Sequence, residues 1–593
     1  MIEPRIYRAA FLPALLAIVI GMFSLENRPA PLPQGLAADV LFDGNMAVTG
    51  TRALVTSFPN RRPGTTGDLS SARSVAASFS HSGFDTRISH FEDSGKSLAN
   101  VVGTRVGATR RQIVVIAARD AASVPDATGS AADTAALLEM ARVLEGRATR
   151  KTLVLVSVDG STLGSVGARH FLQSDADRGL VDGVIVLSNL AAERSRGPLL
   201  VTWGNDATRT GISLKRTLSN ALVQELDKVP GDEHAFGQLV REAFPLGIGD
   251  QGPLVSDGLD AVRVSGSGEL PPPHSERGVN DIDPNRVGSL GRGVLRAVAS
   301  LDTGGKLRDG PHAYVVVGRK VLPGWSLAML GFTLILPALV ASIDAFARAR
   351  RRRQAVGRWW RWVLAGSVPF LLGLVLAELL GLFGAAPDVS SSPVSPDVNP
   401  LSGGAWAQLA AVAAVIAAGW AFVRVPLIRR VGASGDPATV GAPCAAALLM
   451  SGLAVVTWLI NPFAALFLLV PLHVWMLATL GPEDRRGAAP FLLVGLGFLP
   501  IALVALYYMV RLQLGPLDSL WYLYQLVAGH HIGFASALIG CLVLGVFGSD
   551  VSTLIARARR PLPQAVPAHP PIRGPGGHAG PGSLGGTRSA IRR

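Results

Sequence analysis

Cysteine and charge are both scarce in this chain of 593 residues. Its two cysteines, Cys444 and Cys541, fall within long apolar stretches, so the remainder of the chain has no disulfide framework to stabilise it. Charged residues make up only 16% of the sequence, whereas hydrophobic residues make up 49%. This balance excludes an ordinary soluble protein and indicates a membrane protein.

Eight apolar segments are long enough to span a bilayer, which takes about 17–25 residues. They are Ala9–Leu25, Val321–Ile343, Val363–Phe383, Ala405–Val423, Ala442–Ile460, Phe463–Leu480, Pro490–Val510 and Ile532–Gly548. We therefore expect a cytoplasmic N-terminus and anchor (residues 1–36), a water-exposed domain (37–310) and a seven-span bundle (311–550). A basic tail (551–593), rich in Pro, Gly and Arg, is predicted to be disordered.

Positive charge is concentrated beside the apolar segments. The chain has 55 Lys and Arg against 42 Asp and Glu, a net charge of +13. Seven arginines lie between Arg348 and Arg361. Further groups follow other segments: Arg424, Arg429 and Arg430; Arg485 and Arg486; and Arg557, Arg559 and Arg560. If the segments alternate in direction, all of these arginines lie on one side, which is the positive-inside bias. We therefore expect contact with anionic membrane lipids and no nucleic-acid partner.

The same bias predicts the topology. The basic N-terminus is cytoplasmic, the loop Ala385–Gly404 has no Lys or Arg and is outside, and eight spans return the C-terminus to the cytoplasm. We expect a multi-pass plasma-membrane protein with an extracytoplasmic domain. A cleaved signal peptide is the alternative for the first segment, but no small-x-small site directly follows Leu25, so we favour an uncleaved anchor.

The water-exposed domain has an α/β pattern. Short β-branched runs at Ile113–Ala117, Thr152–Val158 and Val181–Leu187 contain almost no polar residues. Helical spacing of apolar residues occupies Ala131–Gly146 between the first two. Such runs are typical of a mostly parallel sheet that is buried on both faces. In such sheets the functional residues lie at the carboxyl ends of the strands. Gly304–Gly310 is a plausible linker into the bundle.

Several motifs, in a fixed order, resemble the zinc-dependent aminopeptidase family, which also includes glutamate carboxypeptidases. They are FPNRRPGTTG (Phe58–Gly67), SLANVVGTRVG (Ser97–Gly107), VDGSTLGSVGARHF (Val158–Phe171) and PPPHSERGVNDIDP (Pro271–Pro284). The resemblance extends from about Asp39 to Leu301. It implies a zinc-aminopeptidase-like fold. Enzymes of that family use two zinc ions, held by His and carboxylate, and a glutamate base.

Carried over position by position, the resemblance implies that the zinc site is degenerate. The first ligand histidine is replaced by Ala118, and the bridging aspartate falls near Gly129. The general-base glutamate becomes Ser161 and the adjacent ligand glutamate becomes Thr162. A further carboxylate ligand falls at Ser188 or Asn189. His274 alone remains as a candidate ligand, and Asp120 matches a family aspartate that lies behind the ligands.

Neutral hydroxyl and amide groups are poor replacements for carboxylates on a water-activating cation. We therefore expect no catalytic residues, no bound metal and no cofactor, and a binding or scaffold role. The alternative is a membrane zinc aminopeptidase with atypical ligands, in which case zinc is the cofactor. A serine hydrolase built on Ser161 and the nearby His170 is disfavoured, because Gly160–Gly164 lacks the Gly-x-Ser-x-Gly pattern.

Glu378 lies within the third apolar segment, where a carboxylate is costly and is by default a functional candidate. The alternative is that Glu378 lies near the outer end of the span, where it faces water or forms a hydrogen bond with a neighbouring helix. His473, or His530 and His531, are its candidate partners. Glu378 also supports a third functional class, in which the bundle handles a lipid or a small solute.

The layout of one anchor, a peptidase-like exported domain and about seven further spans is similar to the Gaa-type subunit of the GPI transamidase. That resemblance rests on layout alone. It implies a non-proteolytic protein that binds a peptide or lipid-linked client for partner subunits.

Overall fold

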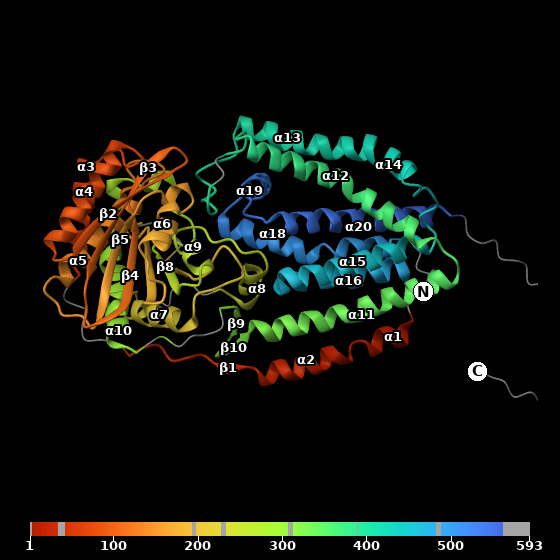
Figure 1. Cartoon of the computed structure of the whole chain (residues 1–593), viewed down its shortest axis with the longest axis horizontal. Helices are drawn as coiled ribbons and strands as arrows, with labels where there is room; N and C mark the ends of the chain where they lie inside the picture. Colours follow the sequence, from red (N-terminus) through yellow and green to blue (C-terminus); the bar gives the residue numbers. More distant parts are fainter. Residues whose placement is uncertain are drawn as a thin grey trace, which may run out of the picture.

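The structure is a computed structural model that describes residues 3–33, 42–192, 197–226, 233–305, 307, 312–387, 390–481 and 488–560. An α/β domain and a long helical bundle lie end to end (Figure 1). The tail beyond residue 560, Arg485 and Arg486, and most of the expected linker Gly304–Gly310 lie outside the described residues.

A seven-stranded sheet forms the centre of the α/β domain. In spatial order its strands are β2 (Asp85–Asp93), β3 (Lys96–Arg105), β5 (Lys151–Val158), β4 (Thr109–Ala118), β6 (Val181–Ser188), β8 (Ala261–Ser265) and β7 (Leu199–Val201). Strands β4, β5 and β6 confirm the three predicted β-branched runs. The sheet is mixed, however: β5, β4, β6 and β8 are parallel, whereas β2, β3 and β7 pair antiparallel.

The prediction of a mostly parallel sheet was therefore too simple. Strands β2 and β3 are joined by a two-residue turn at Ser94 and Gly95, both with positive φ. A turn this short can join only antiparallel strands. No apolar run precedes the turn, so hydropathy gave no sign of it. The alternating burial of β2 is that of an edge strand with one face towards solvent.

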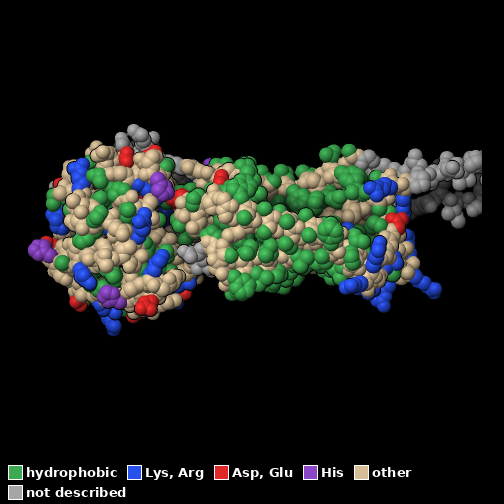
Figure 2. Space-filling model, turned by 90° about the horizontal axis from the view of Figure 1, so that it is seen from above, with side chains coloured by type: hydrophobic (Ala, Val, Ile, Leu, Met, Phe, Trp, Pro, Cys, Tyr) green, Lys and Arg blue, Asp and Glu red, His purple; other side chains and the backbone are tan. Residues whose placement is uncertain are grey.

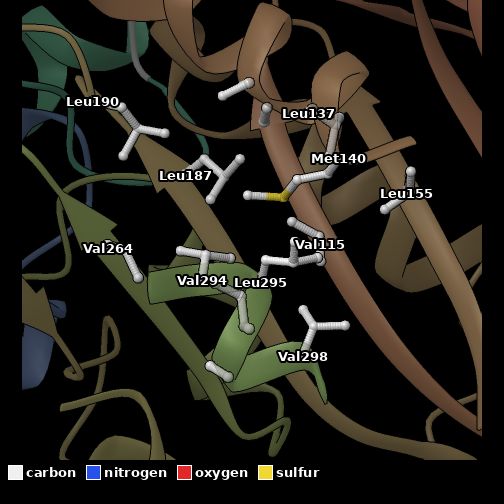
Figure 3. Packing of buried hydrophobic residues seen from close by; sticks show 14 of the residues in the cluster. Val115, Leu137, Met140, Leu155, Leu187, Leu190, Val264, Val294, Leu295 and Val298 are labelled. Carbon is white, nitrogen blue, oxygen red and sulfur yellow. The ribbon is translucent and has the colours of Figure 1, made fainter. Parts of the chain in front are cut away.

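Helices cover both faces of the sheet. One face packs against α3 (Gly44–Ser57), α4 (Thr66–His81), α5 (Ala132–Leu144), α7 (Ile212–Leu226) and α10 (Pro284–Thr303). The other packs against α6 (Val166–Ser174) and α9 (Gln251–Ser256). Figure 3 shows Val115 of β4 and Leu187 of β6 facing Met140 of α5 and Val294 of α10. Burying each such side chain contributes about 1.5–3 kcal/mol to folding. Helix α5 confirms the predicted helix.

The bundle contains every described helix that is long and apolar enough to cross a membrane. There are seven such helices, or eight if the bent pair α17–α18 counts as one span. They are α1–α2 (Pro4–Ala9 and Leu12–Phe23), α11 (Gly324–Arg351), α12 (Val356–Leu382), α13–η5–α14 (Gly403–Ala418, Gly419–Val423 and Arg424–Arg430), α15 (Gly441–Ile460), α16 (Pro462–Leu480), α17–α18 (Ala489–Leu496 and Leu499–Leu512) and α20 (Phe534–Arg559). The eight predicted segments fall on these helices.

Helix α20 runs past the expected end of the bundle at residue 550 and into the segment expected to be a tail. The apolar residues after Ser552 continue the helix, and basic residues in its last turn, Arg557 and Arg559, favour a helix C-terminus. The helix α19 (Pro516–Ala528), which is shorter than α20, lies between α18 and α20 in the sequence.

Arginines gather at the end of the bundle that lies away from the α/β domain. Figure 2 shows hydrophobic side chains covering the bundle and blue basic side chains at that far end. Arg348 of α11 lies 3.9 Å from Glu3, and Arg560 pairs with Asp436 at 2.7 Å. The N-terminus lies at the same end (Figure 1). We call this the arginine end and the opposite one the domain end.

A small sheet joins the start of the bundle to the α/β domain. Strand β1 (Glu26–Asn27) pairs antiparallel with β10 (Lys320–Pro323), which pairs with β9 (Tyr314–Val317). The chain segments that follow α2 and precede α11 are thereby fixed side by side at the domain end of the bundle.

Helix α8 (Ala235–Ala243) docks the α/β domain onto the bundle. Its Val240 and Ala243 pack against Phe463, Phe467 and Val504. The buried guanidinium of Arg241 forms an ion pair with Glu269 and donates a hydrogen bond of 3.0 Å to the Tyr507 hydroxyl of α18. The domain therefore sits on the bundle through a packed and hydrogen-bonded interface.

Candidate functional site

Six of the seven positions that the resemblance assigns to the zinc site lie along one edge of the domain. Ala118 ends β4, Ser161 and Thr162 form a 3-10 turn just after β5, and Asn189 directly follows β6. Gly129 lies in the π-helical turn that opens α5, and Asp120 lies two residues beyond β4. The carboxyl ends of neighbouring parallel strands bring these positions together, as the α/β pattern predicted.

Asp120 is the most heavily engaged of these residues. Its buried carboxylate accepts hydrogen bonds from the Ser161 N–H at 3.0 Å, the Thr162 N–H at 2.9 Å and the Thr162 hydroxyl at 2.6 Å. Burial raises the pKa of Asp120 to about 6, although the bonds from Thr162 lower it. Ser161 and Thr162, which the resemblance assigns to glutamate positions, therefore hold Asp120 in place.

Ser161 has an acidic partner that the sequence did not indicate. Its hydroxyl donates to Asp250 Oδ2 at 2.7 Å, and burial raises the pKa of Asp250. His170 does not join them. Its ring stacks on Phe91 at 4.3 Å, and its Nε2 lies 2.9 Å from the Ser89 hydroxyl. The serine and histidine of the disfavoured hydrolase hypothesis therefore have separate partners.

Asp133, in the first turn of α5, is a second buried carboxylate that we did not anticipate. It accepts the backbone N–H groups of Asn189 at 2.8 Å and Leu190 at 3.0 Å. Burial raises the pKa of Asp133 to about 8, against the lowering effect of those bonds. Asn189 thus contributes its backbone to this contact, while its side-chain amide donates to the Ser188 hydroxyl at 3.0 Å.

Two buried guanidinium groups supply positive charge at this edge. Arg119 donates to the two carboxylate oxygens of Asp68 at 3.0 and 3.1 Å. Arg263 of β8 donates to the Ser188 hydroxyl at 3.3 Å and to the Glu269 carbonyl at 2.9 Å. Burial lowers the pKa of Arg263, while Glu269, Asp250 and Asp133 raise it. Because these side chains come from distant segments, no local motif could have identified the cluster.

These residues do not fit the two zinc ions that the family fold implies. Ala118 and Gly129 offer no donor, and an added Cβ at Gly129 would lie 2.7 Å from the Asp126 carboxylate oxygens. The nearby carboxylates are already engaged by backbone amides or by Ser161. Among the residues that the structure describes, no three His, Cys, Asp or Glu side chains are placed to hold a metal ion.

His274 lies apart from the other six positions, in an exposed 3-10 turn. It lines a cavity of about 410 Å³ between the α/β domain and the bundle, which we call the His274 cavity. The domain side includes Leu270, Pro272, His274 and Glu276, and the bundle side includes Asp397, Trp521 and Tyr522. Arg277 pairs with Asp397 at 2.5 Å across this junction. The His274 cavity is therefore shaped jointly by both parts of the chain.

Glu378 of α12 has one of its proposed partners. His530 Nδ1 lies 2.9 Å from its carboxylate, and the side chains are 57% and 17% exposed for His530 and Glu378. His473 is not a partner: its ring nitrogens lie 2.8 Å from the Tyr7 hydroxyl and 2.9 Å from the Leu334 carbonyl. The interpretation of Glu378 as a residue near the helix end that bonds a neighbour therefore fits the geometry.

The bundle also buries a carboxylate that the hydropathy pattern missed. Asp550 of α20 is 2% exposed, and its Oδ1 has no hydrogen-bond partner among the described residues. The predicted segment ended at Gly548, just before it, because the polar residues Ser549 and Asp550 follow directly.

Comparisons with known proteins find a peptidase-family match within the α/β domain. Residues 100–297 match the sequence model of Peptidase family M28. A curated relative is the alkaline phosphatase isozyme conversion protein of Escherichia coli (strain K12), 29% identical over 206 residues. That match covers 28% of this chain and 60% of the relative, so the chain spans less than two thirds of the relative's length.

Solved structures with a similar fold include a glutaminyl cyclase of Bacteroides thetaiotaomicron bound to N-acetylhistamine, with 16% identity and a TM-score of 0.37. The match covers 45% of this chain and 99% of that one. The zinc aminopeptidase BSAP of Bacillus subtilis has 13% identity and a TM-score of 0.37, with the same coverage. The match to Peptidase family M28 at residues 100–297 falls within the stretch, Asp39 to Leu301, in which the sequence resembles zinc aminopeptidases.

Proposed function

We propose that this chain is a membrane-anchored, catalytically inactive relative of the peptidases, which binds a peptide or lipid-linked client for partner subunits. One observation carries the proposal: Asp120 is held by Ser161 and Thr162, at the positions of the family's base and ligand glutamates. Loss of the general base by itself lowers the rate of this kind of catalysis by a factor on the order of 10²–10⁴. Fold and reaction are separable, so the domain can retain binding without chemistry.

The His274 cavity supports the binding part of the proposal. Its walls combine the aromatic side chains Trp521 and Tyr522 with prolines and a few polar groups, which is the usual make-up of a ligand site. Glu276 contributes one buried carboxylate oxygen, Oε2, without a hydrogen-bond partner among the described residues. A client bound in the His274 cavity would contact both the α/β domain and the bundle.

The membrane part of the proposal rests on the long apolar helices and on the arginine end. Under the positive-inside bias, the arginine end is cytoplasmic and contacts anionic lipids, and the α/β domain is extracytoplasmic on the plasma membrane. This layout is the one that resembles the Gaa-type subunit, and it supports a scaffold role beside partner subunits.

A chromogenic aminopeptidase assay of the full-length protein in detergent tests the proposal. We expect no turnover above buffer, with or without added zinc, whereas a zinc aminopeptidase assayed in parallel hydrolyses the substrate. Turnover that a chelator abolishes and zinc restores would establish the alternative, a membrane metalloaminopeptidase with atypical ligands. Co-purification from native membranes, with the client and subunits identified by mass, tests the scaffold role.

A further inference from the structure

A second cavity, of about 420 Å³, lies at the junction between the α/β domain and the domain end of the bundle. We call it the Arg169 cavity. Arg169 of α6, Arg178 and Ser256 of α9 line it from the domain, and Ser391, His530 and His531 line it from the bundle. Helices α6 and α9 lie on the bundle side of the sheet (Figure 1). The cavity contains none of the degenerate zinc-site positions.

Its charged groups leave an excess of positive charge. Arg178 forms an ion pair with Asp257, which also lines the cavity, and His530 pairs with Glu378. Arg169 donates a hydrogen bond to the Ser391 carbonyl, and within the described part of the chain it has no carboxylate partner. A guanidinium presents five donors in a planar fork, so most of its donors stay available to a ligand in the cavity.

A second imidazole lies beside Arg169 in the cavity. His531 lies between α19 and α20, outside the long apolar helices, and its Nε2 is 3.4 Å from the Ser390 hydroxyl. Burial lowers the pKa of His531 to about 4, and the positive charges of Arg169 and His530 lower it further. The charged groups that act on His531 are therefore the cationic side chains of Arg169 and His530.

We propose that the Arg169 cavity binds the phosphate group of a phosphate ester. Guanidinium forks bind phosphate oxygens through two parallel hydrogen bonds, and imidazole and serine hydroxyl groups supply further donors. The cavity lies where the apolar surface of the bundle meets the domain, so a phospholipid headgroup can reach it from the bilayer. A soluble phosphate ester reaches it from the water side. This site is separate from the proposed client site, and the two proposals can be tested independently.

Binding is measured by calorimetry on the full-length protein in non-ionic detergent. The probes are inorganic phosphate, glycerol 3-phosphate and a short-chain phosphatidylglycerol. We expect Arg169→Gln to weaken binding at least about tenfold, because a charge-assisted contact is lost. Arg169→Lys, which keeps the charge but not the fork, retains part of the binding. The control is Arg110→Gln at the exposed amino end of β4, which removes the same charge and leaves binding unchanged.

The probes distinguish the two sources of phosphate. Tighter binding of the short-chain lipid than of glycerol 3-phosphate supports a headgroup, and equal binding of the two supports a soluble ester. The proposal is wrong if no probe binds the wild-type protein, or if Arg169→Gln weakens binding no more than Arg110→Gln. Thermal unfolding of each variant checks that any loss comes from a folded protein.

Discussion

Thr162 donates both its backbone N–H and its hydroxyl to Asp120 Oδ2, at 2.9 and 2.6 Å. The resemblance to zinc aminopeptidases assigns the position of Thr162 to a glutamate that binds zinc. Here the same position closes a turn after β5 and satisfies a buried carboxylate, which would be costly to leave without partners. The contact gives the former site a structural role that can be tested without knowing the client.

Thr162→Val removes the hydroxyl at nearly constant volume. The substitution leaves Asp120 with one donor fewer, so we expect it to lower the free energy of unfolding by about 1–3 kcal/mol. Denaturant or thermal unfolding in detergent measures the change. Thr303→Val, at an exposed hydroxyl near the end of α10, is the matched control. An effect at Thr162 no larger than that of the control would contradict the structural role.

The shifted pKa of Asp133 predicts a dependence of stability on pH. The folded-state pKa of about 8 lies above the ordinary value of 3.8, so between these values the folded protein binds more protons than the unfolded chain. Stability contributed by the protonated group is fully present below about pH 4 and is lost as pH rises towards 8, by at most about 1.4 kcal/mol per pH unit.

Asp133→Asn should therefore reduce the fall in melting temperature between about pH 5 and 8. It will not remove the fall, because burial raises the pKa of Asp159 and of Glu242 to about 8 as well. Asp177→Asn, at an exposed aspartate, should leave the profile unchanged. Parallel profiles for wild type and Asp133→Asn would show that the carboxyl group is not shifted in the way the structure implies.

Two tyrosines in the bundle form a matched pair for testing how the domain is docked. The Tyr507 hydroxyl accepts from Arg241 at 3.0 Å and donates to Glu233 at 2.9 Å, whereas the buried Tyr524 hydroxyl has no partner among the described residues. Tyr507→Phe should cost about 1–3 kcal/mol and speed amide hydrogen exchange in α8. Tyr524→Phe should cost nothing. Equal exchange rates in α8 for both variants would refute the docking role of Tyr507.

The pair of Glu378 and His530 should contribute little to stability. His530 is 57% exposed, and ion pairs with this much solvent contact are worth about 1 kcal/mol or less. We expect Glu378→Gln to fold normally and to shift the free energy of unfolding by no more than that. A loss of several kcal/mol would mean that Glu378 supports the bundle from within. A growth or lipid phenotype with normal folding would favour the function of the bundle in handling a lipid or solute.

Hydropathy and residue spacing predicted the individual strands and helices that depend on local sequence. The β-branched run Ile113–Ala117 and the apolar spacing of Ala131–Gly146 became β4 and α5, and the apolar segments became the long helices. The antiparallel pairing of β2 was missed, because a two-residue turn carries little signal in hydropathy. The predicted end of the bundle, residue 550, was too early for α20, because the polar residues Ser549 and Asp550 interrupt the apolar run.

The sequence predicted which positions lie at this edge of the sheet, and it did not predict the contacts that they make. Position-by-position comparison located Ala118, Ser161 and Thr162 at the strand ends. Asp250, by contrast, reaches Ser161 from 89 residues away, and Arg263 reaches Ser188 from 75 residues away. Contacts of such separation are set by the packing of the whole sheet, so they became visible only in three dimensions.

Zinc content is the most direct test of the central claim. The claim is that the residues at the zinc-site positions have a structural role and bind no zinc. The full-length protein is purified without chelator from cells supplied with zinc, and its metal is measured by inductively coupled plasma mass spectrometry. We predict zinc far below one ion per chain, at the level of Thr162→Val and of a metal-free membrane protein prepared in parallel. Stoichiometric zinc that survives dialysis and is lost on substitution of His274 would contradict the account.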